Sequence, residues 1–464
     1  MNRTILALCV GALGAASAAG AAPTVDLPVV VSEAAARRTL DLTVYNRDLA
    51  LVREARELDL PGGPVRIEFR DVPARIDPTS LRVEGGAGFS LLEQNYEFDL
   101  LSRDRILQKY VGRELTWLQE DGSAVTGTLL GMNDGPVYRV DGRIVFEVPG
   151  RIALPDLPAD LRERPTLVWL VQTDKARRPR VEASYLTGGI SWKTDYVLDL
   201  DDAGRKAALQ AWVTLDNQSG AGYEGATLRL VAGDVNRVSA PRPRVMYDSL
   251  AMSAAPEGKG FSESALYDYH LYTLDRPVDL KDRQIKQINL FERDGVPVER
   301  LYRLRADVAV ARAGDGLLPV EVAYRFRNDK AAGLDLPLPA GVFRVYGDSD
   351  GGRQLLGEDR IEHTPKGEEV RLTVGRAFDV VGERVVVRTE RLGDRGQRLT
   401  VKVTLRNHKT EKVTVEVAER AWGEWNITAS TLPVRRISAT EFAFDVPVAA
   451  DGETVLDYTL EMDR

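Results

Sequence analysis

The segment Leu399-Thr400-Val401-Lys402-Val403-Thr404-Leu405-Arg406 alternates apolar and polar side chains without interruption. Because successive side chains of a β-strand point to opposite faces, this segment has one apolar face and one polar face. Strands with one buried and one solvated face are typical of antiparallel sheets. The segment therefore predicts an antiparallel sheet that packs on one side only.

The same alternation recurs along the whole chain, at residues 40–45, 65–70, 181–185, 209–215 and 456–462. Turn sequences rich in glycine separate such segments. They are Pro61-Gly62-Gly63, Asp121-Gly122, Asp134-Gly135, Asp141-Gly142 and Asp451-Gly452. We therefore predict an all-β protein of tandem antiparallel β-sandwich domains.

The 464 residues suffice for about three domains of average size. We predict an N-terminal β-sandwich at residues 22–101, a small barrel at 102–160, a central β-rich domain at 161–383 and a C-terminal immunoglobulin-like sandwich at 384–464. The small barrel is expected to be SH3-like or Sm-like, because a short helix capped by Ser102 precedes five compact segments separated by turns.

The N-terminus has the organisation of a secretory signal peptide. Arg3 provides a positive charge, and an apolar stretch covers residues 5–13. This stretch is shorter than the roughly 20 residues that a membrane span requires. We predict that residues 1–21 form the signal peptide, with cleavage within residues 18–22 and Ala16-Ser17-Ala18 as a competing cleavage motif. The mature protein is then expected to be periplasmic or secreted.

The rest of the sequence limits the kinds of partner and chemistry that are expected for the mature protein. Charged residues interrupt every later apolar run, so no transmembrane segment is expected after signal cleavage. The only cysteine, Cys9, lies within the predicted signal peptide, which leaves no thiol for disulfides, nucleophilic catalysis or zinc. The net charge is −8, and no basic patch interleaved with aromatic residues occurs. Nucleic acid is therefore not an expected partner.

Catalytic motifs are not apparent. There is no Gly-x-Ser-x-Gly elbow, and the three histidines, His270, His363 and His408, form no close ligand pair. Carboxylate pairs for glycan cleavage have no recognisable spacing. We therefore expect neither catalytic residues nor a bound cofactor.

One turn offers oxygen ligands for a cation. Asp348 and Asp350 form an Asp-x-Asp sequence, which could contribute to a calcium site. The following Gly352 and Arg353 break the EF-hand pattern, and a hairpin turn explains the same residues. Calcium is thus a weak alternative.

Residues 239–264 differ in kind from the rest of the chain. They are rich in Ala, Ser, Pro and Gly and lack periodicity, which predicts a mobile loop in the central domain. Apolar loops on rigid β scaffolds often contact partners, although an insertion without a role explains the composition equally well. The side chains predicted to bind are Met246, Tyr247, Leu250, Met252 and Phe261.

Several motifs are spread over nearly all of the predicted mature chain. They are Val44-Tyr45-Asn46 with Leu51-Val52-Arg53, residues 185–192 (YLTGGISW) followed by Asp195-Tyr196, residues 215–220 (LDNQSG), residues 230–236 (LVAGDVN), residues 336–341 (LPLPAG) with 344–346 (RVY), and residues 356–359 (LGED). Together they resemble the family called domain of unknown function 4139, which is related to mucoidy-inhibitor-like exported proteins. The resemblance implies an exported β-rich protein, but the family has no assigned chemistry.

These observations favour an exported, non-enzymatic β-scaffold that mediates protein or polysaccharide interactions in the cell envelope. The alternative is an envelope hydrolase, directed at glycan, with an unrecognised carboxylate site. A calcium-stabilised structural protein is a third possibility.

Overall fold

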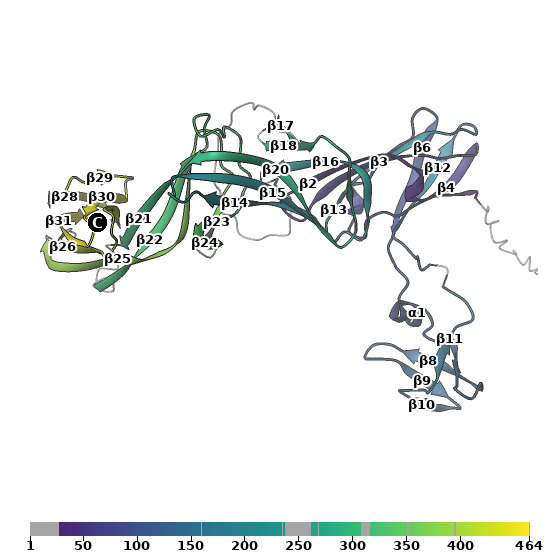
Figure 1. Cartoon of the computed structure of the whole chain (residues 1–464). Helices are drawn as coiled ribbons and strands as arrows, with labels where there is room; N and C mark the ends of the chain where they lie inside the picture. The colour runs from purple at the N-terminus through teal and green to yellow at the C-terminus, as the bar shows by residue number, and fades with distance from the viewer. Residues whose placement is uncertain are drawn as a thin grey trace, which may run out of the picture.

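The computed structural model describes residues 27–463, except for residues 159, 234, 237–260, 268, 308–315, 350–351 and 394–395. Strands dominate these residues, so the all-β prediction is confirmed. The chain forms an elongated body, and a small unit projects from one end of it (Figure 1). None of the described helices is long and apolar enough to cross a membrane.

The first sheet has four strands and lies at the end of the body from which the small unit projects (Figure 1). Its strands, in spatial order, are β1 (Val29–Ser32), β4 (Gly63–Arg70), β12 (Thr166–Thr173) and β6 (Phe89–Glu97). Strand β1 is parallel to β4, whereas β12 is antiparallel to both β4 and β6.

The second sheet combines N-terminal and central segments. Its strands, in spatial order, are β17 (Phe261–Leu266), β18 (Tyr269–Leu274), β16 (Tyr223–Ala232), β2 (Arg37–Tyr45), β3 (Ala50–Glu57), β13 (Arg180–Thr187) and β5 (Arg82–Glu84), with β19 (Val278–Leu280) paired to β16. The third sheet consists of β20 (Gln284–Pro297), β15 (Lys206–Asn217), β14 (Ile190–Leu200), β23 (Gly341–Ser349) and β24 (Gly352–Ile361).

One hydrophobic core joins these three sheets, with Val44, Trp169 and Val213 among its buried members. The separate sandwich predicted at residues 22–101 is therefore wrong. Strand β4 pairs with β12 and β3 pairs with β13, so strands from the N-terminal region complete sheets with strands beyond residue 160. Alternation identifies a strand but not its partner, which is why the sequence placed a boundary here.

The fourth sheet has nine strands and forms the opposite end of the body (Figure 1). Its strands, in spatial order, are β28 (Glu424–Ser430), β31 (Gly452–Asp463), β26 (Gly396–Asn407), β25 (Glu369–Leu392), β22 (Gly316–Arg327), β21 (Glu299–Asp307), β27 (Val413–Arg420), β30 (Glu441–Val448) and β29 (Arg435–Arg436). The alternating segment at residues 399–406 lies within β26, and Leu399, Val401, Val403 and Leu405 are all buried in this sheet's own core.

The boundary predicted between residues 383 and 384 lies inside a strand and is also wrong. Strand β25 is 24 residues long and passes from one core to the other, because Leu372 belongs to the first core and Val380 to the second. Strand β22 makes the same passage, with Phe326 in the first core and Val320 in the second. The C-terminal unit thus includes strands that precede residue 384.

The small unit at residues 102–154 has a hydrophobic core of its own, which includes Leu107, Trp117 and Leu129. Its helix α1 (Arg103–Lys109) begins after Ser102, whose Oγ accepts a hydrogen bond from the Arg105 N–H at 3.2 Å. Its strands, in spatial order, are β10 (Arg143–Val145), β9 (Val137–Val140), β8 (Ala124–Gly131), β7 (Glu114–Leu118) and β11 (Arg151–Ala153). The predicted helix and five strands are present, whereas a closed SH3-like or Sm-like barrel remains a prediction.

Candidate binding site

The motifs that carry the family resemblance lie side by side in the central sheets. The bonds that join one motif to another run from Gln218 N to Gly189 O (2.6 Å), from Trp192 Nε1 to Val231 O (3.2 Å), from Tyr196 Oη to Pro339 O (2.7 Å) and from Arg344 Nη1 to Asp195 Oδ1 (3.3 Å). At Gly189, where φ is +82°, an added Cβ would lie 2.7 Å from the Cα of Ser219, so a side chain does not fit. These contacts give the motif residues structural roles.

The predicted interaction loop is placed only in part. Met246, Tyr247, Leu250 and Met252 lie outside the described residues. Phe261 begins strand β17 and is only 5% exposed within the large core. Its assignment to a partner-binding loop is therefore wrong, because a strand that pairs with β18 has carried this ring into the core.

Among the described residues, those predicted for calcium binding or histidine chemistry have separate partners. Asp348 lies in β23 opposite Arg353, whereas Asp350 lies outside the described residues. The Nδ1 atom of His270 is 2.8 Å from Glu263 Oε1, and the Nδ1 atom of His363 accepts a hydrogen bond from the Ala340 N–H at 3.1 Å. Within the described part of the chain, no group of three or more His, Cys, Asp or Glu side chains is arranged to hold a metal ion.

The small unit contains an apolar cavity of about 1020 Å³. Helix α1 contributes Ile106 and Leu107, while β7 and β9 contribute Trp117 and Tyr138. The segment that joins β10 to β11 supplies a further part of the wall, which includes Phe146, and β11 contributes Ile152. A cavity of this size with aromatic and aliphatic walls is typical of a binding site.

The floor and the rim of this cavity differ in exposure. Trp117 and Tyr138 form the floor, and they are 1% and 3% exposed. Gly127 lies beneath this floor, where an added Cβ would lie 2.8 Å from the Arg139 carbonyl oxygen and 3.2 Å from the Trp117 ring. Phe146, in contrast, is 71% exposed at the rim, which leaves a large apolar ring in water. Exposed aromatic groups beside an apolar cavity mark an interaction surface.

The backbone around the cavity also offers hydrogen bonds. Strands β10 and β11 are the two edge strands of the five-stranded sheet. An edge strand presents backbone N–H and C=O groups to which a further extended segment can pair. Ile144, the central residue of β10, is 62% exposed. Arg103, Arg151 and Glu147 provide the charges among the residues that line the cavity.

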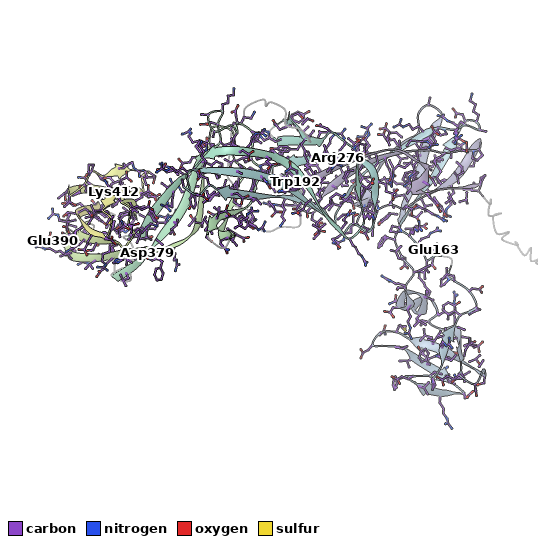
Figure 2. All side chains as sticks on the ribbon, in the orientation of Figure 1. Glu163, Trp192, Arg276, Asp379, Glu390 and Lys412 are labelled. Carbon is purple, nitrogen blue, oxygen red and sulfur yellow. The ribbon has the colours of Figure 1, made fainter. Side chains whose placement is uncertain are left out.

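Two chain segments connect the small unit to the body, and Glu163 marks the returning segment (Figure 2). They are bonded to each other, because the Leu101 N–H donates to Arg162 O and the Arg162 N–H donates to Asp99 O, each at 2.9 Å. The Arg162 guanidinium also pairs with Glu97 at 2.5 Å and with Glu68 at 3.4 Å. The base of the projecting unit is thus held by backbone bonds and ion pairs together.

None of the residues that line this cavity was predictable as a binding residue from the sequence motifs. Trp117 and Tyr138 occur in short alternating segments that any small β-domain contains, and the exposure of Phe146 depends on the path of the chain after β10. A signal was present in the composition of residues 144–148 (IVFEV), which form an apolar run that only one glutamate interrupts.

The fold and this cavity define an all-β protein with a projecting small unit. No protein-family model and no curated protein matches the sequence. The resemblance to the family called domain of unknown function 4139 therefore remains a prediction.

Proposed function

We propose that this protein is an exported, non-enzymatic β-scaffold of the cell envelope, whose small unit binds an extended apolar segment of another envelope protein. The observation that carries this proposal is the open apolar cavity with Phe146 exposed at its rim. Burying such a ring against a partner would stabilise the complex by about 2 kcal/mol through removal of apolar surface from water.

The edge strands favour an extended protein segment over other apolar ligands. A segment that pairs with β10 or β11 would satisfy backbone groups at the sheet edge while placing alternate side chains in the cavity. The position of the small unit supports the same proposal, because the unit projects from the body (Figure 1) and neither of its edge strands pairs with a second described strand.

A glycan hydrolase draws no support from Glu68, the buried carboxylate at the base of the small unit. Such an enzyme needs a carboxylic acid that remains protonated near neutral pH, which requires a raised pKa. The ion pairs at the base of the small unit instead lower the pKa of Glu68. Burial would raise the pKa of Glu68, but the hydrogen bond from Arg70 and the charge of Arg162 outweigh it and hold this pKa below its usual range.

Site-specific photocrosslinking tests the proposal. The full chain is expressed in its native envelope with p-benzoylphenylalanine in place of Phe146, and adducts are identified by mass spectrometry. The matched control carries the same group in place of Leu317, which is 69% exposed on the C-terminal sheet. We expect a protein adduct at position 146 that is absent at position 317. The same adducts at both positions, adducts to glycan alone, or none would contradict the proposal.

A further inference from the structure

A second cavity, of about 840 Å³, lies where the chain passes from the large core to the C-terminal core. One wall is the turn between β14 and β15, which contributes residues 203–205. The C-terminal sheet supplies the other walls, with residues 298–303 at the start of β21 and residues 411–416 around the start of β27. The Val298 N–H donates to the Arg205 carbonyl oxygen at 2.9 Å, which fixes the turn against β21.

The walls of this cavity are cationic, although the chain as a whole has a net charge of −8. The cationic lining residues are Arg205, Arg300, Arg303, Arg325, Arg371, Lys412 and Arg435. The acidic lining residues are Glu299, Glu411, Glu416 and Asp445. Glu369 and Glu441, which lie outside the lining, also pair with Arg325 and Arg303. Even with these two carboxylates included, the cations remain in excess.

Three guanidinium groups of the cavity wall share the carboxylate of Glu416, and each also pairs with a second carboxylate: Arg303 with Glu441, Arg371 with Glu369 and Arg435 with Asp445. Glu416 lies 2.6 Å from Arg303 Nε, 2.6 Å from Arg435 Nη2 and 3.7 Å from Arg371 Nη1. Arg303 is only 9% exposed. Burial lowers the pKa of Arg303. The carboxylates of Glu416 and Glu441 raise this pKa, whereas the positive charges of Arg305 and Arg371 lower it, and the net result is a lowered pKa. These three guanidinium groups are thus matched by carboxylates, and the excess positive charge of the cavity lies on cations elsewhere in its lining.

Two further cations line the cavity and are exposed to solvent. They are Arg205, from the β14–β15 turn, and Lys412, from the turn before β27, and neither forms an ion pair with a described carboxylate. The nearby Asp201 carboxylate is engaged within its own turn, where Oδ1 accepts hydrogen bonds from the Arg205 and Lys206 N–H groups at 2.8 and 3.1 Å. Lys412 lies on the C-terminal unit (Figure 2).

From this arrangement we propose that the cavity binds an acidic saccharide, a short glycan that carries carboxylate groups. Arginine and lysine side chains bind carboxylates through charge-assisted hydrogen bonds. The carboxylates of Glu299 and Glu411 are bonded to Arg325 and Arg300, but each carboxylate has further lone pairs that can accept from the hydroxyl groups of a sugar. The hydroxyl of Thr414 lies on the same wall and can both donate and accept. A purely inorganic anion would leave this remaining hydrogen-bonding capacity unused. The proposal is independent of the protein partner proposed for the small unit.

Calorimetric titration of the full chain tests this site with three probes. Trigalacturonate carries carboxylates on a saccharide, maltotriose is its neutral counterpart, and tripolyphosphate carries oxyanions without a sugar. We expect trigalacturonate to bind and to weaken as salt is added, because salt screens the contacts at the exposed rim. Maltotriose should not bind detectably, and tripolyphosphate should bind more weakly than trigalacturonate.

Variants then locate the site. The double variant Arg205→Ser, Lys412→Ala should bind trigalacturonate at least about tenfold more weakly, which corresponds to about 1.4 kcal/mol. Its matched control is Arg391→Ser, Lys402→Ala, which removes the same two charges from exposed positions outside the cavity and should bind as the unaltered chain does. Because all four side chains are exposed, neither variant should impair folding.

Each remaining outcome overturns the proposal. No binding of trigalacturonate, or equal affinity in the two double variants, would show that the cavity is not the site. Tighter binding of tripolyphosphate than of trigalacturonate would show that the cavity selects oxyanions without recognising a saccharide.

Discussion

Trp117 and Tyr138 meet edge to face at the floor of the apolar cavity, with ring centroids 4.9 Å apart and an angle of 88° between the rings. They come from β7 and β9, which are separated in the sheet by β8. Their contact therefore holds the small unit together across its sheet, while the rim at Phe146 has little part in this packing. Substitutions at the floor and at the rim should accordingly have different consequences.

Trp117→Ala should destabilise the small unit by about 3–5 kcal/mol, because it removes a large buried side chain and leaves a void. Phe146→Ser should change stability by less than about 0.5 kcal/mol, because this ring is mostly in water already. Hydrogen–deuterium exchange of residues 103–153 measures both effects locally, without requiring the whole chain to unfold in one step. Equal loss of protection in the two variants would contradict the assignment of floor and rim.

The C-terminal core contains an ion pair between Arg384 and Glu419, which are 1% and 0% exposed. Arg384 Nε lies 2.8 Å from Glu419 Oε1, and Nη2 lies 3.2 Å from Oε2. Glu419→Ala should cost about 3–5 kcal/mol in urea unfolding, because it leaves a buried guanidinium without its counterion. The double variant Arg384→Met, Glu419→Leu should recover most of this loss. A double variant as unstable as Glu419→Ala would show that lost packing, rather than the unpaired charge of Arg384, causes the loss of stability.

The folding stability of the protein should fall in acid, partly because the carboxylate of Asp71 becomes protonated. Burial opposes its ionisation, but the Ala34 N–H at 2.9 Å and the Arg164 guanidinium at 2.6 Å outweigh burial and hold the pKa of Asp71 below its usual range. A lowered folded-state pKa stabilises the fold above the unfolded value of about 4, and this contribution is lost as pH falls through the folded-state pKa.

Asp71→Asn tests this dependence. At neutral pH the variant should be less stable than the unaltered chain in urea unfolding, and the difference should shrink as pH falls below about 4. Asparagine also tolerates the positive φ of 62° at this position, so backbone strain should not confuse the comparison. A difference that is constant with pH would rule out the carboxylate as its source.

The predicted signal peptide implies that the exported protein has a defined mature N-terminus. Intact-mass spectrometry of the protein from a periplasmic or culture fraction should give a chain that starts at Ala22, or at Ala19 if residues 16–18 direct cleavage. Recovery of a chain that retains residues 1–21 would contradict the predicted signal peptide.

The six segments of alternating polarity were sufficient to predict the strands β2, β4, β13, β15, β26 and β31. Leu399, Val401, Val403 and Leu405 share a buried face of β26, as their spacing requires. The helix after Ser102 was predictable for a similar local reason, because its cap lies three residues from the N–H that it satisfies. Phe261 was misassigned, since an apolar residue beside a segment without periodicity reads equally well as the end of a loop or the start of a strand.

The sequence by itself determined the all-β class, the turns and the faces of individual strands, because these depend on side chains two residues apart or on a few consecutive residues. Only the tertiary structure decided that β4 and β12 share a sheet, that β25 belongs to two cores, and that Arg303 and Arg435 meet at Glu416. These relationships join residues that are tens to more than a hundred positions apart. Strand pairing and packing between sheets set them, and the order of residues within a strand carries no record of its partner.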